Sequence, residues 1–174
     1  LRDKYRAERD KRVRDDGNDQ YLEVKGDFSH YVDDPYVEKG FDRDALTEEL
    51  EVLVIGGGFG GMLAAARLIE QGITDIKIIE KGGGFGGTWY WNRYPGASCD
   101  IESYVYLPML EETGFVPRQK YTDAPETLAY CQVLAEKFGL NDLALMQTEV
   151  VSTEWDETTR RWTVTTNRQD NLKA

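Results

Sequence analysis

Histidine, cysteine and long apolar runs are scarce in this sequence. Its 174 residues include one histidine, His30, and two cysteines, Cys99 and Cys131, which lie too far apart for a CxxC redox or zinc motif. We therefore expect neither a metal cluster nor a disulfide scaffold. No segment approaches the roughly 18 apolar residues of a membrane helix, and the charged residues 1–6 do not resemble a signal peptide. These absences predict a cytoplasmic protein that does not bind membranes.

Positive charge is also in the minority. The chain carries 21 Lys and Arg residues against 32 Asp and Glu residues, a formal net charge of -11, so its surface repels nucleic acid at long range. An apolar content of 40% supports a globular domain with a core. The first residue is not Met and the last residues follow a strand-rich segment, which indicates a piece of a longer chain.

Residues 1–49 are predicted to form an N-terminal extension. Residues 1–20 mix charges of both signs and favour a solvated helix or a flexible arm. Residues 21–41 contain aromatic side chains without helical or strand periodicity, which indicates a segment wrapped on the surface of the main domain. Residues 44–51 are predicted to be a short polar helix-like segment.

Residues 50–174 are predicted to form an incomplete Rossmann-like α/β domain. A β-branched run at residues 51–55 is typical of a strand buried on both faces of a parallel sheet. Glycines follow in the pattern Gly56-x-Gly58-x-x-Gly61, and then come a helix at residues 62–70 and a second strand at residues 75–79 that ends at Glu80. This order is that of a βαβ unit with a parallel sheet.

The remaining segments predict one more helix and the start of an antiparallel β-meander. Asp123 is a candidate N-cap for a helix that ends near residue 138. Residues 143–155 and 161–166 read as strands joined by a polar turn, whereas residues 104–115 read as a loop with short turns.

The first glycine motif has a known phosphate chemistry. Gly56 permits the tight turn, Gly58 lets the backbone approach a pyrophosphate, and Gly61 lets the helix pack closely on the strand. Glu80 then stands where a carboxylate accepts hydrogen bonds from both ribose hydroxyls and repels a ribose phosphate, which favours FAD or NAD over NADP. The alternative is a solvated carboxylate at the end of a strand.

The hexapeptide Gly-Gly-Gly-Phe-Gly-Gly occurs a second time, at residues 82–87, where it leads into aromatic residues and not into a helix-forming run. We interpret this copy as backbone that passes close to a bound cofactor. Trp89, Trp91 and Tyr94 behind it are either core residues or residues that face a flat ring.

Two carboxylates near the end of this segment share one face of an extended chain. Asp100 and Glu102 are either an acid/base pair or a pair that orients a positive side chain, for which Arg93 is the only candidate nearby in sequence. Cys99 is most simply a small buried residue, and Cys131 a core residue of a helix.

Residues 86–103, Gly-Gly-Thr-Trp-Tyr-Trp-Asn-Arg-Tyr-Pro-Gly-Ala-x-Cys-Asp-x-Glu-Ser, set behind the glycine motif and Glu80, closely resemble the Baeyer–Villiger monooxygenases. The resemblance covers roughly residues 50–166, and the N-terminal extension resembles that of members which oxidise bulky or polycyclic ketones. It implies FAD on this domain, NADPH on a second domain of the same polypeptide, and insertion of one oxygen atom of O2 next to a ketone carbonyl to give an ester or lactone.

The resemblance also implies roles for individual residues. The pyrophosphate would lie on Gly56, Gly58, Phe59, Gly60 and Gly61, and the ribose on Glu80, next to Lys81. The flavin side would contact Gly87, Thr88, Trp89, Tyr90 and Trp91, the isoalloxazine Asp100 and Tyr106, and the adenine the backbone of Val150. Ser98, Cys99 and Asp100 would border the nicotinamide cofactor, although the family more often has Arg at the position of Ser98.

Asp100 is the one catalytic residue that the resemblance implies. It would position an arginine that is not among these 174 residues, so the chain alone is expected to be inactive. Two other functions stay open: a related flavin monooxygenase that acts on nitrogen or sulfur, and an FAD-binding fragment without catalysis.

Overall fold

The computed structural model describes residues 1–22 and 24–174, which divide into two compact units, Leu1–Pro35 and Tyr36–Ala174. The first unit contains α1 (Arg2–Asp10), η1 (Gly17–Gln20) and η2 (Gly26–Tyr31), and none of these helices has a buried residue. An exposed pair between Lys11 and Glu8 at 2.7 Å shows the local charge pairing of this segment. The predicted solvated helix is thus present as α1.

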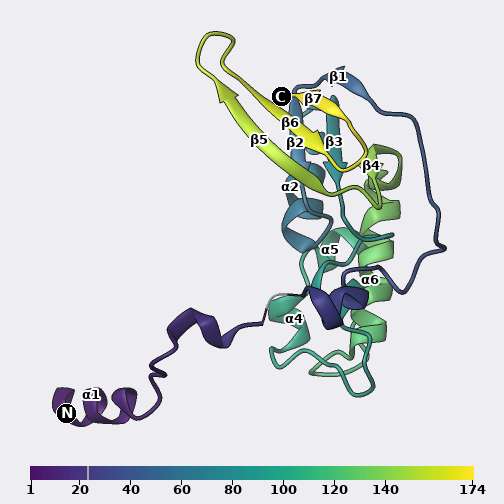
Figure 1. Cartoon of the computed structure of the whole chain (residues 1–174). Helices are drawn as coiled ribbons and strands as arrows, with labels where there is room; N and C mark the ends of the chain where they lie inside the picture. Colours follow the sequence, from purple (N-terminus) through teal and green to yellow (C-terminus); the bar gives the residue numbers. More distant parts are fainter. Residues whose placement is uncertain (23) are drawn as a thin grey trace. The chain divides into compact units, whose positions relative to one another are not determined.

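The second unit contains the predicted βαβ unit (Figure 1). Strand β2 (Val52–Ile55) leads through the glycine turn into α2 (Phe59–Glu70), and β3 (Ile76–Ile79) follows and pairs with β2 in parallel. A short third strand, β4 (Ala144–Leu145), pairs with β3 in parallel, which gives the sheet order β2-β3-β4. The predicted α/β class with a parallel sheet is confirmed.

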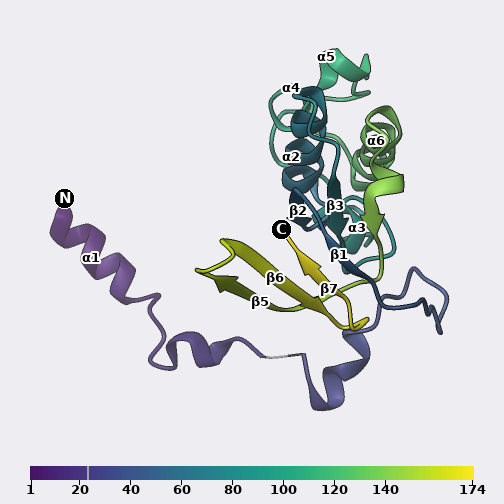
Figure 2. The same cartoon turned by 90° about the horizontal axis from the view of Figure 1, so that it is seen from above.

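The strand buried on both faces is β3, whereas the prediction placed such burial on the run at residues 51–55, where β2 is only half-buried and Ile55 is 57% exposed. Ile78 packs with Met62 of α2 and with Tyr130 of α6 (Ala124–Lys137), whereas Ile79 packs with Val164 and Leu172 of the second sheet. Side chains alternate between the faces of a strand, so consecutive isoleucines join two different cores. In Figure 2, α2 and α6 flank the end of the parallel sheet.

The second sheet is the predicted meander with one additional strand. Strands β5 (Val150–Asp156), β6 (Arg161–Thr166) and β7 (Asn171–Lys173) are antiparallel neighbours, and β1 (Thr47–Glu49) pairs with β7 in parallel. Figure 1 shows the β5–β6 hairpin reaching out beyond the helices.

The prediction of a helix-like segment at residues 44–51 was wrong, because strand β1 occupies the middle of this range. The backbone N–H of Asn171 donates to the oxygen of Leu46 (2.8 Å), and that of Leu50 donates to the oxygen of Lys173 (2.8 Å). Pairing with a strand more than a hundred residues away overrides the local polar pattern.

Two further predicted segments differ in detail. The strand region 143–155 is divided into β4 and β5, which lie in different sheets, and Gln147 between them has a positive φ of 51°. The predicted loop 104–115 overlaps two single-turn helices, α4 (Ser103–Tyr106) and α5 (Leu110–Thr113). Single turns are too short to produce a periodic sequence pattern. The two remaining short helices are α3 (Thr88–Trp91) and η3 (Leu140–Leu143).

Helix α6 begins as its sequence predicts. Asp123 is the N-cap, and its Oδ1 accepts from the backbone N–H of Glu126 at 2.9 Å. No helix in the described part of the chain has the length and apolar character that a membrane span requires. The division of the chain into a 1–49 extension and a domain from residue 50 stays a prediction.

Candidate cofactor site

The first glycine motif forms the turn from β2 into α2. Gly56 has a φ of +104°, which side chains rarely tolerate, and a Cβ atom on Gly61 would lie 1.9 Å from the carbonyl oxygen of Gly56. Helix α2 has Gly58 as its N-cap, and no side chain caps it. Around Gly60, a Cβ atom would meet nothing within 4 Å. The turn therefore presents the positive end of a helix in a glycine cradle, which suits a phosphate group.

The second glycine hexapeptide packs directly on the first. The backbone N–H of Gly86 donates to the oxygen of Gly57 at 3.0 Å. A Cβ atom on Gly87, whose φ is +54°, would lie 2.9 Å from the Cα atom of Gly58. Both copies therefore need glycine, the first for its turn and the second for its approach to the first.

Glu80 is buried between the two glycine segments. Its side chain accepts one hydrogen bond from the N–H of Gly57 (2.5 Å) and one from the N–H of Gly82 (2.6 Å), and the residue is 6% exposed. The solvated strand-end carboxylate considered above is thereby ruled out. Each carboxylate oxygen has a second lone pair, so the group can still accept hydrogen bonds from sugar hydroxyls.

The aromatic segment 88–91 contributes more to the core than to the surface. Trp89 and Tyr90 are buried, and the Trp89 indole N–H donates to the hydroxyl of Tyr106 at 2.8 Å. Trp89 packs with Cys99 and Ala97, and burial raises the pKa of the Tyr106 hydroxyl. Cys99 is therefore the small buried residue that the sequence predicts, while Tyr94 is 63% exposed.

The segment that carries Ser98 and Asp100 is held by backbone pairing. The N–H of Cys99 donates to the oxygen of Thr122 at 2.9 Å, and the N–H of Ala124 donates to the oxygen of Ala97 at 2.8 Å. Ser98 and Asp100 are both exposed. Within residues 1–22 and 24–174, Asp100 has no hydrogen-bond or ion-pair partner. Backbone pairing therefore fixes the place of Asp100 at the surface, and no described side chain fixes the orientation of its carboxylate.

Two basic residues, Lys120 and Arg93, lie near Asp100 and Glu102 in space or in sequence, and neither pairs with Asp100. Glu102 pairs with Lys120 at 2.8 Å. The Arg93 guanidinium lies 3.8 Å from the ring centre of Tyr36 and 4.4 Å from that of Tyr90, and its Nε donates to the oxygen of Tyr90 at 2.8 Å. Arg93 is therefore a stacking partner of two tyrosines and does not pair with Asp100.

A cavity of about 420 Å³ lies beside this segment, between the loop after α3 and the start of α6. It brings Trp89 and Ser98 together but includes neither Glu80 nor Asp100. Its lining consists of Trp89, Arg93, Tyr94, Pro95, Gly96, Ala97, Ser98, Asp123, Ala124, Pro125 and Leu128.

Val150, where the adenine contact is predicted, follows a loop that is hydrogen-bonded to Glu80. The backbone N–H of Thr148 donates to the carbonyl oxygen of Glu80 at 2.9 Å, and Val150 is the first residue of β5. Lys81 pairs with Glu149 at 2.9 Å, and both side chains are about half exposed. The fold therefore brings Glu80, Lys81 and the start of β5 together.

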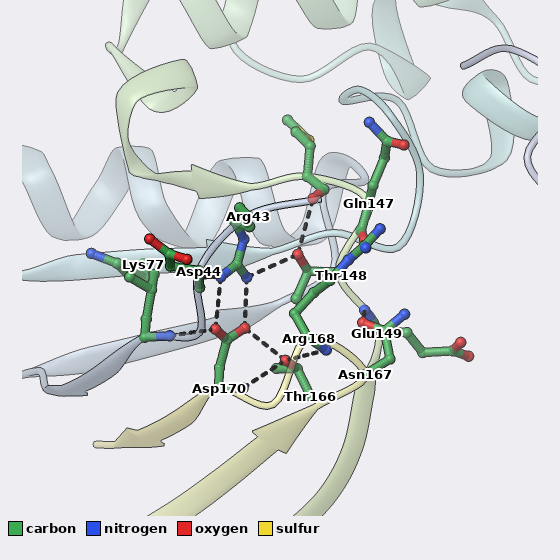
Figure 3. A network of polar contacts seen from close by, with 12 residues as sticks. Arg43, Asp44, Lys77, Gln147, Thr148, Glu149, Thr166, Asn167, Arg168 and Asp170 are labelled. Carbon is green, nitrogen blue, oxygen red and sulfur yellow. Dashed lines mark hydrogen bonds and ion pairs between the residues drawn. The ribbon is translucent and has the colours of Figure 1, made fainter. Parts of the chain in front are cut away.

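Sequence reasoning missed a polar network beside Glu80. Arg43 and Asp170 form an ion pair there that also reaches Thr148 (Figure 3). The partners are 127 positions apart, so no local pattern could have revealed them.

Comparison with known proteins agrees with this geometry. Residues 54–113 match the family model described as an NAD(P)-binding Rossmann-like domain. The chain is 49% identical to Baeyer-Villiger monooxygenase ATR8 of Stachybotrys chlorohalonatus, an alignment that includes 100% of this chain and 28% of that protein. The chain thus spans less than a third of the length of the curated relatives that it matches.

Solved structures similar to this chain include a monooxygenase and a complex with FAD and NADP. The polycyclic ketone monooxygenase from Thermothelomyces thermophila superposes with a TM-score of 0.86 at 36% identity over 99% of this chain and 30% of its own. A structure titled as the OTEMO complex with FAD and NADP aligns at 30% identity with a TM-score of 0.68, over 72% of this chain and 24% of its own.

Proposed function

We propose that this chain, which is related over its whole length to the N-terminal part of Baeyer–Villiger monooxygenases, forms the FAD-binding part of such an enzyme. The complete enzyme would use NADPH and O2 to insert one oxygen atom next to the carbonyl of a ketone, giving an ester or lactone. The likeness to a polycyclic ketone monooxygenase over 99% of this chain supports a bulky ketone as the substrate.

One observation carries the FAD assignment. The Glu80 carboxylate is fixed by the N–H groups of Gly57 and Gly82 beside the uncapped N-terminus of α2. A diphosphate fits the positive helix end, and a ribose with two free hydroxyls fits the carboxylate. A ribose phosphate would be repelled by Glu80, so this site suits FAD, and NADPH would bind to the rest of the polypeptide.

The residues present divide the work between binding and orientation. The turn from Gly56 to Gly61 would hold the pyrophosphate, and Glu80 with Lys81 the ribose. The backbone of Val150 would meet the adenine. Bound FAD would supply the redox chemistry and the activation of oxygen. Its ring side would be lined by Gly87, Thr88, Trp89, Tyr90, Trp91 and Tyr106.

Asp100 would act through a positive partner. Its exposed carboxylate has no partner in the described part of the chain, so it is available to hold an arginine of the rest of the enzyme by charge pairing. Such an arginine would stabilise negative charge during oxygen transfer. Ser98 and Cys99 would border the nicotinamide cofactor on the same segment.

Both cysteines are buried and free, which agrees with a reducing compartment and supports a cytoplasmic location for the enzyme.

The test uses the full-length protein with NADPH, O2 and a bicyclic or polycyclic ketone. We expect bound FAD after purification, ketone-dependent NADPH oxidation, and an ester or lactone that is one oxygen atom heavier than the ketone. NADPH oxidation without ester, in protein that retains its flavin, would overturn the assignment. Parallel reactions with a thioether and an amine test whether the enzyme instead oxidises heteroatoms.

A further inference from the structure

The ion pair between Arg43 and Asp170 lies outside every residue assigned to the cofactor. Arg43 donates two parallel hydrogen bonds to the carboxylate, from Nη1 at 2.7 Å and from Nη2 at 2.6 Å. The Asp170 side chain is 0% exposed and that of Arg43 is 19% exposed. This bidentate geometry fixes the orientation of both groups and excludes most water.

The Asp170 carboxylate is fully used within this cluster. It also accepts from the backbone N–H of Leu46 (2.8 Å) and from the hydroxyl of Thr166 (2.6 Å). Burial raises the pKa of Asp170, but the hydrogen bonds from Arg43, Thr166 and Leu46 outweigh that effect and lower it to about 2. The carboxylate is therefore ionised at neutral pH and joins the segment before β1 to the turn before β7.

The cluster reaches the candidate ribose site through one residue. Arg43 Nη2 donates to the hydroxyl of Thr148 at 3.2 Å, and the fully buried Thr148 donates its backbone N–H to the carbonyl oxygen of Glu80 at 2.9 Å. The next contact along this loop is from the N–H of Gln147 to the oxygen of Gly82 at 2.9 Å. The loop between β4 and β5 is thus held between the ion pair and the Glu80–Gly82 backbone. Figure 3 shows the contact of Arg43 with Thr148 and Asp170.

A second arginine, in the turn between β6 and β7 that also carries Asp170, holds the same loop. Arg168 donates from Nε to the oxygen of Gln147 (3.1 Å) and from Nη1 to the oxygen of Phe41 (2.8 Å). Because Gln147 has a positive φ of 51°, its conformation needs support from its surroundings. Arg168 supplies it at Gln147 itself, and Arg43 holds the next residue, Thr148.

A buried ion pair is weak evidence for stability, because desolvation offsets much of the attraction between its charges. What such a pair does supply is a fixed geometry. Here that geometry ends two hydrogen bonds away, at the backbone of Glu80, whose carboxylate is proposed to bind ribose.

We propose that Arg43 and Asp170 are positioning residues for the adenosine end of the FAD site. They set the place of Thr148, and Thr148 sets the place of the Glu80–Gly82 backbone and of the first residues of β5. The inference rests on the proposed FAD function and adds to it residues outside those assigned to the cofactor.

The test compares variants of the full-length protein by FAD titration. Arg43→Lys keeps the charge but cannot form the bidentate pair, so we expect the Kd for FAD to rise by about tenfold or more, as for residues that orient a binding group. Asp170→Asn should have the same effect. The control is Glu70→Gln, which breaks the 2.7 Å pair of Glu70 with Arg67 in α2, outside the Arg43–Asp170 cluster.

Thermal unfolding separates positioning from mere stabilisation. A positioning role predicts a smaller FAD-induced rise in Tm for Arg43→Lys than for the wild type and Glu70→Gln. A lower Tm of the apoprotein with an unchanged Kd and an unchanged FAD-induced rise would overturn the inference.

If the arginine variant does not fold, Thr148→Val provides the same test. It removes the hydroxyl that Arg43 contacts, and an unchanged Kd would again overturn the inference. A wild-type protein that binds no FAD would instead refute the proposed function, and the inference with it.

Discussion

The backbones of Gly58 and Gly87 lie so close together that a Cβ atom on Gly87 would come within 2.9 Å of the Cα atom of Gly58. The two residues belong to the two copies of one hexapeptide, and the copies have different tasks. The first copy makes the turn into α2, and the second packs against that turn and leads into the short helix α3. Identical sequences therefore form two layers of one cradle.

The first prediction concerns this contact. Gly87→Ala adds a Cβ atom at a φ of +54° and against a backbone atom that cannot move aside. We expect it to lower the free energy of unfolding by more than about 1–3 kcal/mol, the typical cost of backbone strain alone, and to abolish FAD retention. Urea unfolding and flavin absorbance measure the two effects.

Gly72→Ala is the control for this variant. Gly72 has a φ of +86°, but a Cβ atom there would meet nothing within 4 Å, so only the strain remains. Equal losses in the two variants would show that the close approach of Gly87 to Gly58 does not matter.

The second prediction concerns the two hydrogen bonds that the Glu80 carboxylate accepts from glycine N–H groups. Glu80→Gln keeps the shape of the side chain but replaces one acceptor oxygen by an amide group that cannot accept from Gly57 or Gly82. One buried N–H then loses its partner, at a cost of about 1–3 kcal/mol in the free energy of unfolding. FAD retention should fall as well, because ribose would lose an acceptor.

Glu149→Gln serves as the comparison. It removes a charge from the exposed pair with Lys81, which contributes less than about 1 kcal/mol. If it reduced stability and FAD retention as much as Glu80→Gln, the loss would be a general effect of charge near the site and not of the two hydrogen bonds.

The sequence predicted those parts of the fold whose cause is local. The β2–α2–β3 unit follows from an apolar run, a glycine turn and a second apolar run, and α6 follows from the Asp123 N-cap. Strand β1 was missed because its partner β7 is remote in sequence, and the polar residues 47–49 have no apolar alternation to reveal a strand.

The same division applies to the candidate site. The sequence identified Glu80 from its place at the end of a strand, yet it gave no sign that both carboxylate oxygens bind glycine N–H groups. Nor did it identify Arg43 and Asp170, whose pairing depends on two loops meeting in space. Whether Asp100 and its neighbours contact a cofactor stays a prediction.

The third prediction is a pH dependence of stability. The pKa of Asp170 is about 2 in the folded protein and near 4 in an unfolded chain, so the ionised pair stabilises the fold fully above pH 4. That contribution, about 2 kcal/mol, should be lost as the pH falls from about 4 to about 2. Urea unfolding of the wild type and of Asp170→Asn at a series of pH values measures it.

The difference in unfolding free energy between these two proteins should shrink over that interval. Asparagine does not titrate, so all other carboxylates affect both proteins alike and cancel from the difference. A difference that stayed constant from pH 5 to pH 2 would contradict the low pKa of Asp170.

The fourth prediction concerns the cation–π contacts of Arg93 with two tyrosines. Its guanidinium lies 3.8 Å from the Tyr36 ring centre and 4.4 Å from that of Tyr90, and its Nε is held by the oxygen of Tyr90. The contact ties the first residue of the Tyr36–Ala174 unit to the aromatic segment behind the second glycine copy. We expect a coupling energy of about 1 kcal/mol in a double-mutant cycle of Arg93→Leu and Tyr36→Leu.

A parallel cycle with Lys120→Leu and Tyr121→Leu gives the baseline. Lys120 lies 5.4 Å from the ring centre of Tyr121, farther than the 3.8 Å between Arg93 and Tyr36, so their coupling should be below about 0.5 kcal/mol. The Arg93 coupling should also persist at high salt, because a guanidinium this close to two rings is attracted to them mainly at short range, where ions do not screen. A coupling energy for Arg93 and Tyr36 no larger than that for Lys120 and Tyr121 would contradict the prediction. The contact between Arg93 and Tyr36 would then contribute nothing to stability, and Tyr36 would be held by its other contacts.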